Sequence, residues 1–441
     1  MELLTDDDRR ILDLEVGNVV GHTSKLVLLG HRGDAGALTS QELADHVGGR
    51  IHRAPRLTRR LGADSDGRPA WVDDPGFDVR SHVHLYAVDE PVDGDGLSAA
   101  VSELIAIPLS RDRPLWRMDV FENVDGGSAA IVWRLHHAVA DGFMGMQLAE
   151  ALLWDDSLPH EPSAAPAGLG VPGEVARSGR GRFGLRWDEA RATARLYSRF
   201  PGTTARELLP RYASASLDAE VKRERSLALV EAGLDELRHL GKAHGEDITL
   251  NDVILAVVAG ALRMWLHDRG DALRGIRAKV PVSLHTPTEG TEGPSNRDSF
   301  FFVELPVDES DPVARLRSIS RSASNRKQHR DAETLYKMPF TNAKSRWAQS
   351  LHVFTFNVSN VRGPSRPLSV AGAPVEHLYS IAEIAEHHAL RIAALSSSGR
   401  VAISVCADAA AVPDLAQLER GLYASIDELR TRAGRHASRV G

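Results

Sequence analysis

The sequence predicts an α/β protein made of two similar layers, with a functional site between them. Three observations lead to this fold class. The chain has 441 residues, which is longer than a domain with a single hydrophobic core usually is, so two domains of roughly 200 residues each are expected. Strand-like alternation and helical periodicity occur together in both halves of the chain. Between the halves, residues 156–184 are rich in Pro, Ala, Gly and Ser, which predicts an exposed crossover linker.

The N-terminal half, residues 1–155, leads into a pair of histidines. Its predicted elements are a helix near residues 97–105, strands over 116–121 and 129–135, and a helix that begins after Gly142. The second strand runs directly into His136 and His137. The histidines are therefore expected at a strand-to-helix turn, where side chains can project into a cleft.

The rest of the chain divides into the linker, residues 156–220, and a C-terminal half, residues 221–441. The linker includes a basic helical stretch over roughly residues 185–212. In the C-terminal half, the sequence Thr249-Leu250-Asn251-Asp252 resembles a capping box that opens a long helix. The predicted elements of this half are helices over 234–243 and 253–267, and strands over 226–230, 278–282, 300–305, 353–358, 389–395 and 401–405.

Composition excludes several classes of protein. The net charge of −7 argues against a nucleic-acid partner, because no face is obliged to be strongly basic. The single cysteine, Cys406, excludes an intrachain disulfide and a cysteine-based zinc cluster. The N-terminus is acidic where a signal peptide is basic, and the longest apolar stretch, residues 253–262, is shorter than the ~20 residues that span a bilayer. We therefore expect a cytoplasmic protein, with peripheral membrane contact left open.

The run from His136 to Gly142 points to acyl transfer. When an alcohol or amine attacks a thioester, a base must remove its proton, and a neutral imidazole with a pKa near 7 suits that role. We assign this role to His137, with His136 as a neighbour that braces it. Asp141 is expected to anchor the turn by pairing with a cation, and Gly142 to let the backbone approach closely.

Other chemistries find less support. Adjacent side chains on an extended segment point to opposite sides, so His136 and His137 cannot easily share a metal ion, and no metal is expected. A purely structural role for the pair is the third interpretation. The sequence has no Gly-Xaa-Ser-Xaa-Gly nucleophile elbow and no phosphate-binding Gly-Xaa4-Gly-Lys-Ser/Thr loop. The Gly-Xaa-Gly-Xaa-Xaa-Gly pattern that begins at Gly168 lies in the linker without a preceding strand, which indicates chance.

Further motifs are spread over nearly the whole chain. They are Pro114-Leu115-Trp116, Asn251-Asp252-Val253 with Ala259-Gly260-Ala261-Leu262-Arg263, Val280-Pro281-Val282-Ser283, Asn360-Val361-Arg362-Gly363-Pro364, Ser396 with Gly399-Arg400, and Asp408 before Val412-Pro413-Asp414. With the His136–Gly142 run, they resemble the bacterial wax ester synthase/diacylglycerol acyltransferase family. The histidine run alone is shared with condensation domains of peptide synthetases and with other acyl-CoA-dependent acyltransferases.

The resemblance implies a chloramphenicol-acetyltransferase-like fold, with two related α/β subdomains and a tunnel between them. It also implies transfer from acyl-CoA, used as a substrate without a separate cofactor, to an alcohol or diacylglycerol, which forms a wax ester or triacylglycerol. By motif match His137 is the base, with His136, Asp141 and Gly142 beside it. The positions assigned to substrate binding by the same match are Asn251, Asp252, Ser283, His285 and Asn296. Asn251 and Asp252 are equally well explained as part of the helix cap.

Several positions depart from the family pattern and keep other acceptors open. His285 stands where relatives have an arginine, and Ser295 stands where they have a glycine. Ser397 and Ser398 fall where a tyrosine is common, and Glu386-His387-His388 replaces a glycine-containing segment. An alternative function is therefore acylation of a non-lipid hydroxyl or amine, from CoA or from a carrier protein. A third hypothesis is a non-catalytic lipid-binding or partner-binding protein, against which the intact histidine run argues.

Overall fold

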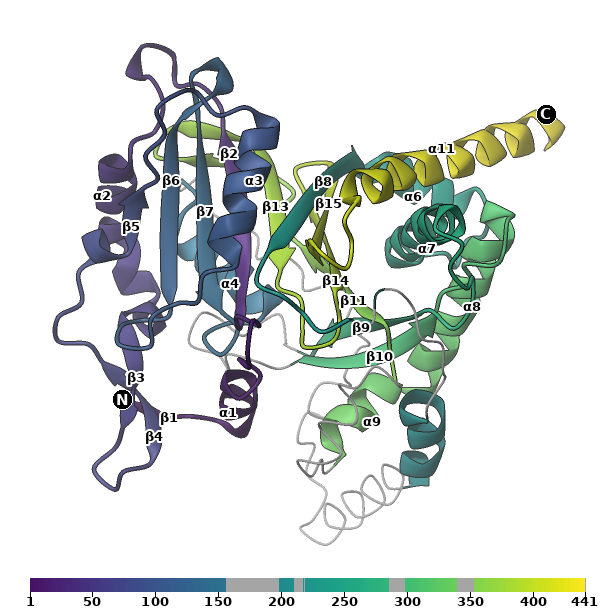
Figure 1. Cartoon of the computed structure of the whole chain (residues 1–441), viewed down its shortest axis with the longest axis horizontal. Coiled ribbons are helices and arrows are strands. Elements are labelled where there is room, and N and C mark those ends of the chain that lie inside the picture. The colour runs from purple at the N-terminus through teal and green to yellow at the C-terminus, as the bar shows by residue number, and fades with distance from the viewer. Residues whose placement is uncertain (156–197, 210–216, 218, 285–297, 339–352, 441) are drawn as a thin grey trace, which may run out of the picture.

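The chain forms two six-stranded sheets that lie side by side, with a small three-stranded sheet beside the first (Figure 1). The structure is a computed structural model that describes residues 1–155, 198–209, 217, 219–284, 298–338 and 353–440. The predicted linker over 156–184 and most of the basic stretch after it lie outside the described residues. Two α/β units are thus observed, as the mixed periodicity of both halves predicted.

The first sheet carries the strand that leads into the histidines. Its order is β12-β13-β2-β7-β6-β5. The bounds are β2 (His22–Leu29), β5 (Val83–Leu85), β6 (Trp116–Val124), β7 (Ser128–His136), β12 (Ser369–Val370) and β13 (Ala373–Ala382). Buried side chains of α2 (Ser40–Arg50) and α4 (Gly142–Leu152) share a core with one face of this sheet. The other face packs on α3 (Gly94–Ile105). The predicted strands over 116–121 and 129–135 and both predicted helices are confirmed.

Two strands of the first sheet come from the C-terminal part of the chain. β13 pairs antiparallel with β2, with Ser380 opposite Lys25 and Tyr379 opposite Leu26. Figure 1 shows β13, in yellow-green, beside the purple β2. The division at residues 155 and 220 follows chain order, whereas residues 369–382 belong to the first sheet by hydrogen bonding. Neither β2 nor this crossing was predicted.

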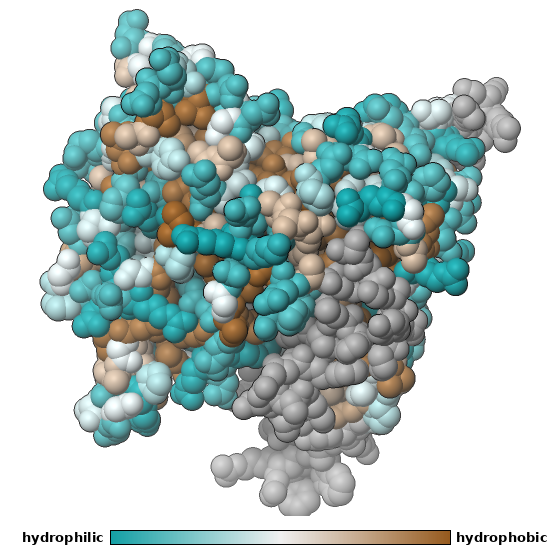
Figure 2. Space-filling model, in the orientation of Figure 1, coloured by the Kyte–Doolittle hydropathy of each residue, from teal (hydrophilic) through white to brown (hydrophobic). Residues whose placement is uncertain are grey.

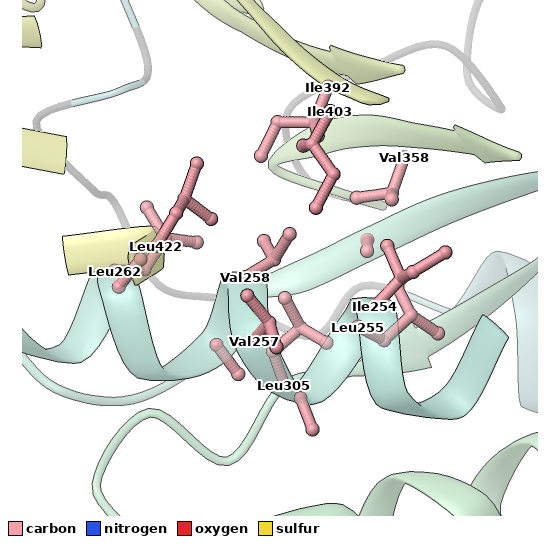
Figure 3. Packing of buried hydrophobic residues seen from close by; sticks show 14 of the residues in the cluster. Ile254, Leu255, Val257, Val258, Leu262, Leu305, Val358, Ile392, Ile403 and Leu422 are labelled. Atoms are coloured by element: carbon pink, nitrogen blue, oxygen red, sulfur yellow. The ribbon is translucent and has the colours of Figure 1, made fainter. Parts of the chain in front are cut away.

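The second sheet has the order β10-β9-β11-β14-β15-β8. The bounds are β8 (Arg225–Gly233), β9 (Arg277–Ser283), β10 (Asp298–Glu304), β11 (Phe356–Arg362), β14 (Leu390–Ser397) and β15 (Arg400–Asp408). Each matches a predicted strand, except that the strand expected over 353–358 begins at Phe356 instead. Three helices that share a core with one face are α7 (Leu250–Asp268), α8 (Pro312–His329) and α11 (Leu415–Val440). Figure 3 shows Val257 and Val258 of α7 among Val358, Ile392 and Ile403 of the sheet.

The long helix α7 begins with the predicted capping box. The Asp252 amide donates to Thr249 Oγ1 at 3.3 Å, and the Thr249 amide donates to Asp252 Oδ2 at 2.9 Å. The helix therefore begins at Leu250, a little before the predicted 253. By length and composition α7 is apolar enough to cross a membrane, but 72% of that apolar window is buried inside the fold. Core packing thus accounts for its hydrophobic residues.

Shorter elements complete the described chain. They are β1 (Glu2–Leu3), α1 (Asp6–Leu12), β3 (Arg59–Ala63), β4 (Pro69–Asp73), α6 (Leu234–Lys242) and α9 (Asp331–Lys337). Figure 2 shows hydrophilic side chains over much of one outer face, with hydrophobic ones in separate places among them. Hydrophobic cores lie inside each half, and a further cluster contains residues of both six-stranded sheets.

Candidate active site

The run His136–Gly142 forms the predicted strand-to-helix turn. β7 ends at His136, and α4 begins at Gly142. The His137 amide donates to the carbonyl oxygen of Gly21 at 2.7 Å, and the Val139 amide donates to the carbonyl oxygen of His136 at 2.9 Å. These bonds fix the backbone on both sides of His137.

His136 is buried, its Nδ1 accepts a hydrogen bond, and its Nε2 lies within ion-pair distance of a carboxylate. The Ala138 amide donates to Nδ1 at 3.0 Å, and Nε2 lies 3.2 Å from Glu15 Oε1. The side chain of His136 is 1% exposed, so neither nitrogen is open to solvent. These contacts agree with a bracing role for His136, which stays a prediction.

His137 is partly exposed at the end of the strand. Burial lowers the pKa of His137 to about 3, the charge of Arg391 acts in the same direction, and Asp141 opposes the shift. Loss of hydration disfavours the protonated form of an imidazole. The pKa is therefore well below the value near 7 that the sequence suggested, and the ring is neutral at neutral pH.

Asp141 caps the helix that follows the turn, and its expected pairing with a cation stays a prediction. It is fully buried and caps α4, because its Oδ1 accepts the Met144 amide at 2.8 Å. A carboxylate at this end also suits the positive end of the helix dipole. The charge of Asp141 acts on Lys25. Burial lowers the pKa of Lys25 to about 8, and Asp141 opposes that shift. Lys25 Nζ donates to Ser380 Oγ of the crossing strand β13 at 2.7 Å.

Gly142 is where the motif meets the second sheet. A Cβ atom built on Gly142 would lie 3.0 Å from Cγ2 of Val361, a residue of β11. Such a contact is tighter than most side-chain contacts, so a larger residue would require the Val361 side chain to shift by a few tenths of an ångström. The predicted close backbone approach at Gly142 is thus observed, and it places the histidine turn at the junction of the halves.

Polar residues of the second sheet face this junction. Lys279, Asn357 and Arg391 are paired across β9, β11 and β14, so their side chains share one face. Val358 and Ile392, one position further along, belong to the core under α7 on the opposite face. Arg391, which lies on this face, is close enough to lower the pKa of His137.

Lys279 in this row is held against aromatic rings. Its side chain is buried, with Nζ 4.4 Å from the ring centre of Phe300 and 5.3 Å from that of Phe354. Burial lowers the pKa of Lys279 to about 7. Sequence reasoning missed Lys279, Asn357 and Arg391, although polar residues inside otherwise apolar predicted strands were a signal that could have found them.

The residues assigned to substrate binding are placed differently. Ser283 is the last residue of β9 and shares the face of Lys279. Asp252 serves the capping box through Oδ2, while its buried Oδ1 has no hydrogen bond to the described residues. Asn251 lies partly exposed in the first turn of α7. His285 and Asn296 lie outside the described residues.

In the second histidine pair, His387-His388, the buried residue His388 has a packing role. The ring of His388 stacks on Phe354 at 4.0 Å, and its Nδ1 lies 2.9 Å from the carbonyl oxygen of Thr355. His387 adopts a left-handed backbone, with φ 62°, and its side chain is half exposed. His388 thus helps hold the segment that enters β11.

Comparison with known proteins identifies the family. The family model of the wax ester synthase/diacylglycerol acyltransferase catalytic domain matches residues 4–254, and that of the WS/DGAT C-terminal domain matches residues 295–430. The chain is 29% identical to a putative diacylglycerol O-acyltransferase of Mycobacterium tuberculosis, over 99% of both chains.

Solved structures share the fold. The wax ester synthase/diacylglycerol acyltransferase from Marinobacter aquaeolei VT8 matches with a TM-score of 0.71 and 22% identity, over 98% of this chain and 100% of that one. The first condensation domain of the CDA synthetase matches with a TM-score of 0.62 and 17% identity, over 97% and 96%. The predicted chloramphenicol-acetyltransferase-like fold class is confirmed by these likenesses. The chain belongs to the wax ester synthase/diacylglycerol acyltransferase family and is an acyltransferase.

Proposed function

We propose that this chain transfers an acyl group from acyl-CoA to the hydroxyl of an alcohol or diacylglycerol, and that His137 is the general base. Family membership supports the donor and the acceptor class. The observation that carries the role of His137 is its place: a neutral imidazole in a backbone-fixed turn where the two halves meet.

The proposed step follows from this neutral ring. The unprotonated ring nitrogen of His137 accepts the hydroxyl proton as the oxygen attacks the thioester carbonyl carbon. The carbon–sulfur bond then breaks, the new ester forms, and the thiolate of CoA takes the proton back from the imidazolium. Proton and charge balance within one turnover, so acyl-CoA enters as a substrate and no further cofactor is proposed.

A neutral ring also fits the cationic surroundings of His137. Burial and the charge of Arg391 both disfavour protonation of His137 in the free enzyme, so its ring is neutral before the substrate binds. The charge of Asp141 acts in the opposite direction and favours the imidazolium, which forms only as the hydroxyl proton moves. The negative charge of Asp141 therefore counts most during the reaction, and we propose it for that role as well as for the cap.

The test is acyl transfer by the purified protein and by His137→Ala. Acyl-CoAs of several chain lengths are offered with alcohols, diacylglycerol and a panel of non-lipid hydroxyls and amines, while thiol release and product mass are followed. A general base contributes about two to four orders of magnitude in rate, so His137→Ala should lose about that much with acyl-CoA binding retained.

The matched control is His267→Ala, which removes an imidazole with a 69% exposed side chain at the far end of α7 and should leave the rate unchanged. A near-normal rate in His137→Ala would refute the proposed mechanism. Efficient turnover with only the non-lipid acceptors would instead support the alternative function.

A further inference from the structure

Glu15 lies outside the histidine run, in the segment between α1 and β2, yet its carboxylate is directed at that run. Its Oε1 is 3.2 Å from His136 Nε2 and accepts the Gly21 amide at 3.0 Å. Its Oε2 accepts from Arg111 Nε at 3.2 Å. The side chain of Glu15 is 13% exposed, so one nearly buried carboxylate joins three separate segments of the first half.

The first effect of Glu15 is on the ring of His136. Because the Ala138 amide donates to Nδ1, that nitrogen carries no proton, and the proton of a neutral ring lies on Nε2. The protonated Nε2 then lies 3.2 Å from Glu15 Oε1, which is within ion-pair distance. The nearby carboxylate therefore favours this tautomer and orientation of His136, whose Nδ1 in turn holds the Ala138 amide, the first amide after His137.

The second effect of Glu15 is on the backbone of His137. Gly21 donates its amide to Glu15, and its carbonyl oxygen accepts the His137 amide at 2.7 Å. A Cβ atom on Gly21 would lie 2.8 Å from His136 Nε2 and 2.9 Å from Glu15 Cγ, so this close packing requires glycine. Glu15 is thus linked to the backbone on both sides of His137, through His136 on one side and through Gly21 on the other.

We propose that Glu15 is a positioning residue for His137, acting through His136 and Gly21 without touching the substrate. The inference rests on the base role proposed for His137. Its carboxylate stays charged at neutral pH, as such a role requires. Burial raises the pKa of Glu15, but the interactions with His136, Arg111 and Gly21 outweigh burial and lower it to about 2. A charged acceptor gives a shorter and stronger hydrogen bond than a neutral one.

Glu15→Gln keeps the shape and one acceptor oxygen but removes the charge. We expect kcat to fall about ten- to a hundredfold, the range found when a carboxylate that orients a metal-bound histidine is changed, with KM for acyl-CoA unchanged. Glu15→Asp keeps the charge and should retain more activity than Glu15→Gln.

The matched control is Glu231→Gln. Glu231 also joins a histidine and an arginine, with Oε1 2.9 Å from His377 Nδ1 and Oε2 2.8 Å from Arg400 Nη1, and its side chain is 16% exposed. It lies on β8 of the second sheet, and its change should leave kcat near that of the unaltered chain.

A double variant separates positioning from general stability. His136→Asn can keep an acceptor near Nδ1 but removes the partner of Glu15, so adding Glu15→Gln to it should lower kcat much less than in the unaltered chain. Normal kcat in Glu15→Gln, or an equal further loss in the His136→Asn background, would overturn the proposal. If His137→Ala itself stays active, the base assignment has failed, which is a different result from normal kcat in Glu15→Gln beside an inactive His137→Ala.

Discussion

At the scale of single residues, His137 combines a low pKa with a proposed role as a base. An imidazole with a pKa of about 3 is a weaker base than a free histidine, but it is unprotonated over the whole neutral range. Its contribution therefore depends on being held at the right place, since its intrinsic basicity is reduced. The fixed turn, the capped helix α4 and the contacts of His136 supply that placement.

This low pKa makes a prediction about pH. An ordinary histidine becomes protonated as pH falls through about 6.5, whereas His137 should stay neutral until pH approaches 3. Arg391, His136 and Lys25 favour this neutral form and Asp141 opposes it. We therefore expect kcat/KM to show no acid limb near pH 6.5. The measurement is a pH profile between 5 and 8.

A stability control accompanies that profile. The unfolded chain binds a proton at His137 below about pH 6.5 and the folded chain does not, so this residue's contribution to stability falls as pH falls below that value. Thermal unfolding at each pH shows whether a loss of rate is a loss of fold. An acid limb near pH 6.5 would contradict the low pKa if the protein is still folded at that pH. The limb must also persist when the buffer and the substrate are changed.

Sequence reasoning found one part of the candidate site and missed another for a physical reason. His136 to Gly142 are neighbours in the chain, so their spacing is visible directly in the sequence. Lys279, Asn357 and Arg391 come together only because β9, β11 and β14 pair, and periodicity shows which face a side chain occupies but not which strand lies beside it.

At the scale of elements, the start of α7 offers two roles for one carboxylate, a structural one and a functional one. The capping box uses Thr249 Oγ1 and Asp252 Oδ2, whereas Asp252 Oδ1 is buried without a hydrogen bond to any described residue. The cap alone accounts for one of the two carboxylate oxygens of Asp252. The two interpretations of Asp252 are therefore separable by experiment.

Two substitutions distinguish these interpretations. Thr249→Ala removes only the cap and should destabilise the protein by about 1 kcal/mol without changing kcat. If Asp252 is a cap and nothing else, Asp252→Ala should have the same effects as Thr249→Ala. The double variant should then lose little more stability than either single variant. Urea unfolding and turnover of the folded fraction measure both effects. A fall in kcat for Asp252→Ala alone would instead assign Asp252 to the site.

At the scale of the whole molecule, the strand crossing explains how much of the fold the sequence could predict. Strands of the second sheet were found because apolar residues cluster or alternate in them. β2 was missed because both of its faces are covered, so nearly every residue from His22 to Leu29 is buried and no alternation remains. Its neighbour β13 lies at the other end of the chain, a pairing that no local pattern indicates.

The crossing predicts that residues 1–155 do not fold alone. Without β13 they would lose Tyr379 and Ile381 from the core and expose a strand edge of β2. Each large apolar side chain contributes about 1.5–3 kcal/mol when buried, so losing several exceeds the usual margin of stability. We expect a fragment of residues 1–170 to be insoluble when expressed alone. Expressed together with residues 171–441, it should form a soluble complex that regains acyl transfer. A fragment 1–170 that is soluble, monomeric and cooperative in unfolding would show that the first half does not need the crossing strand.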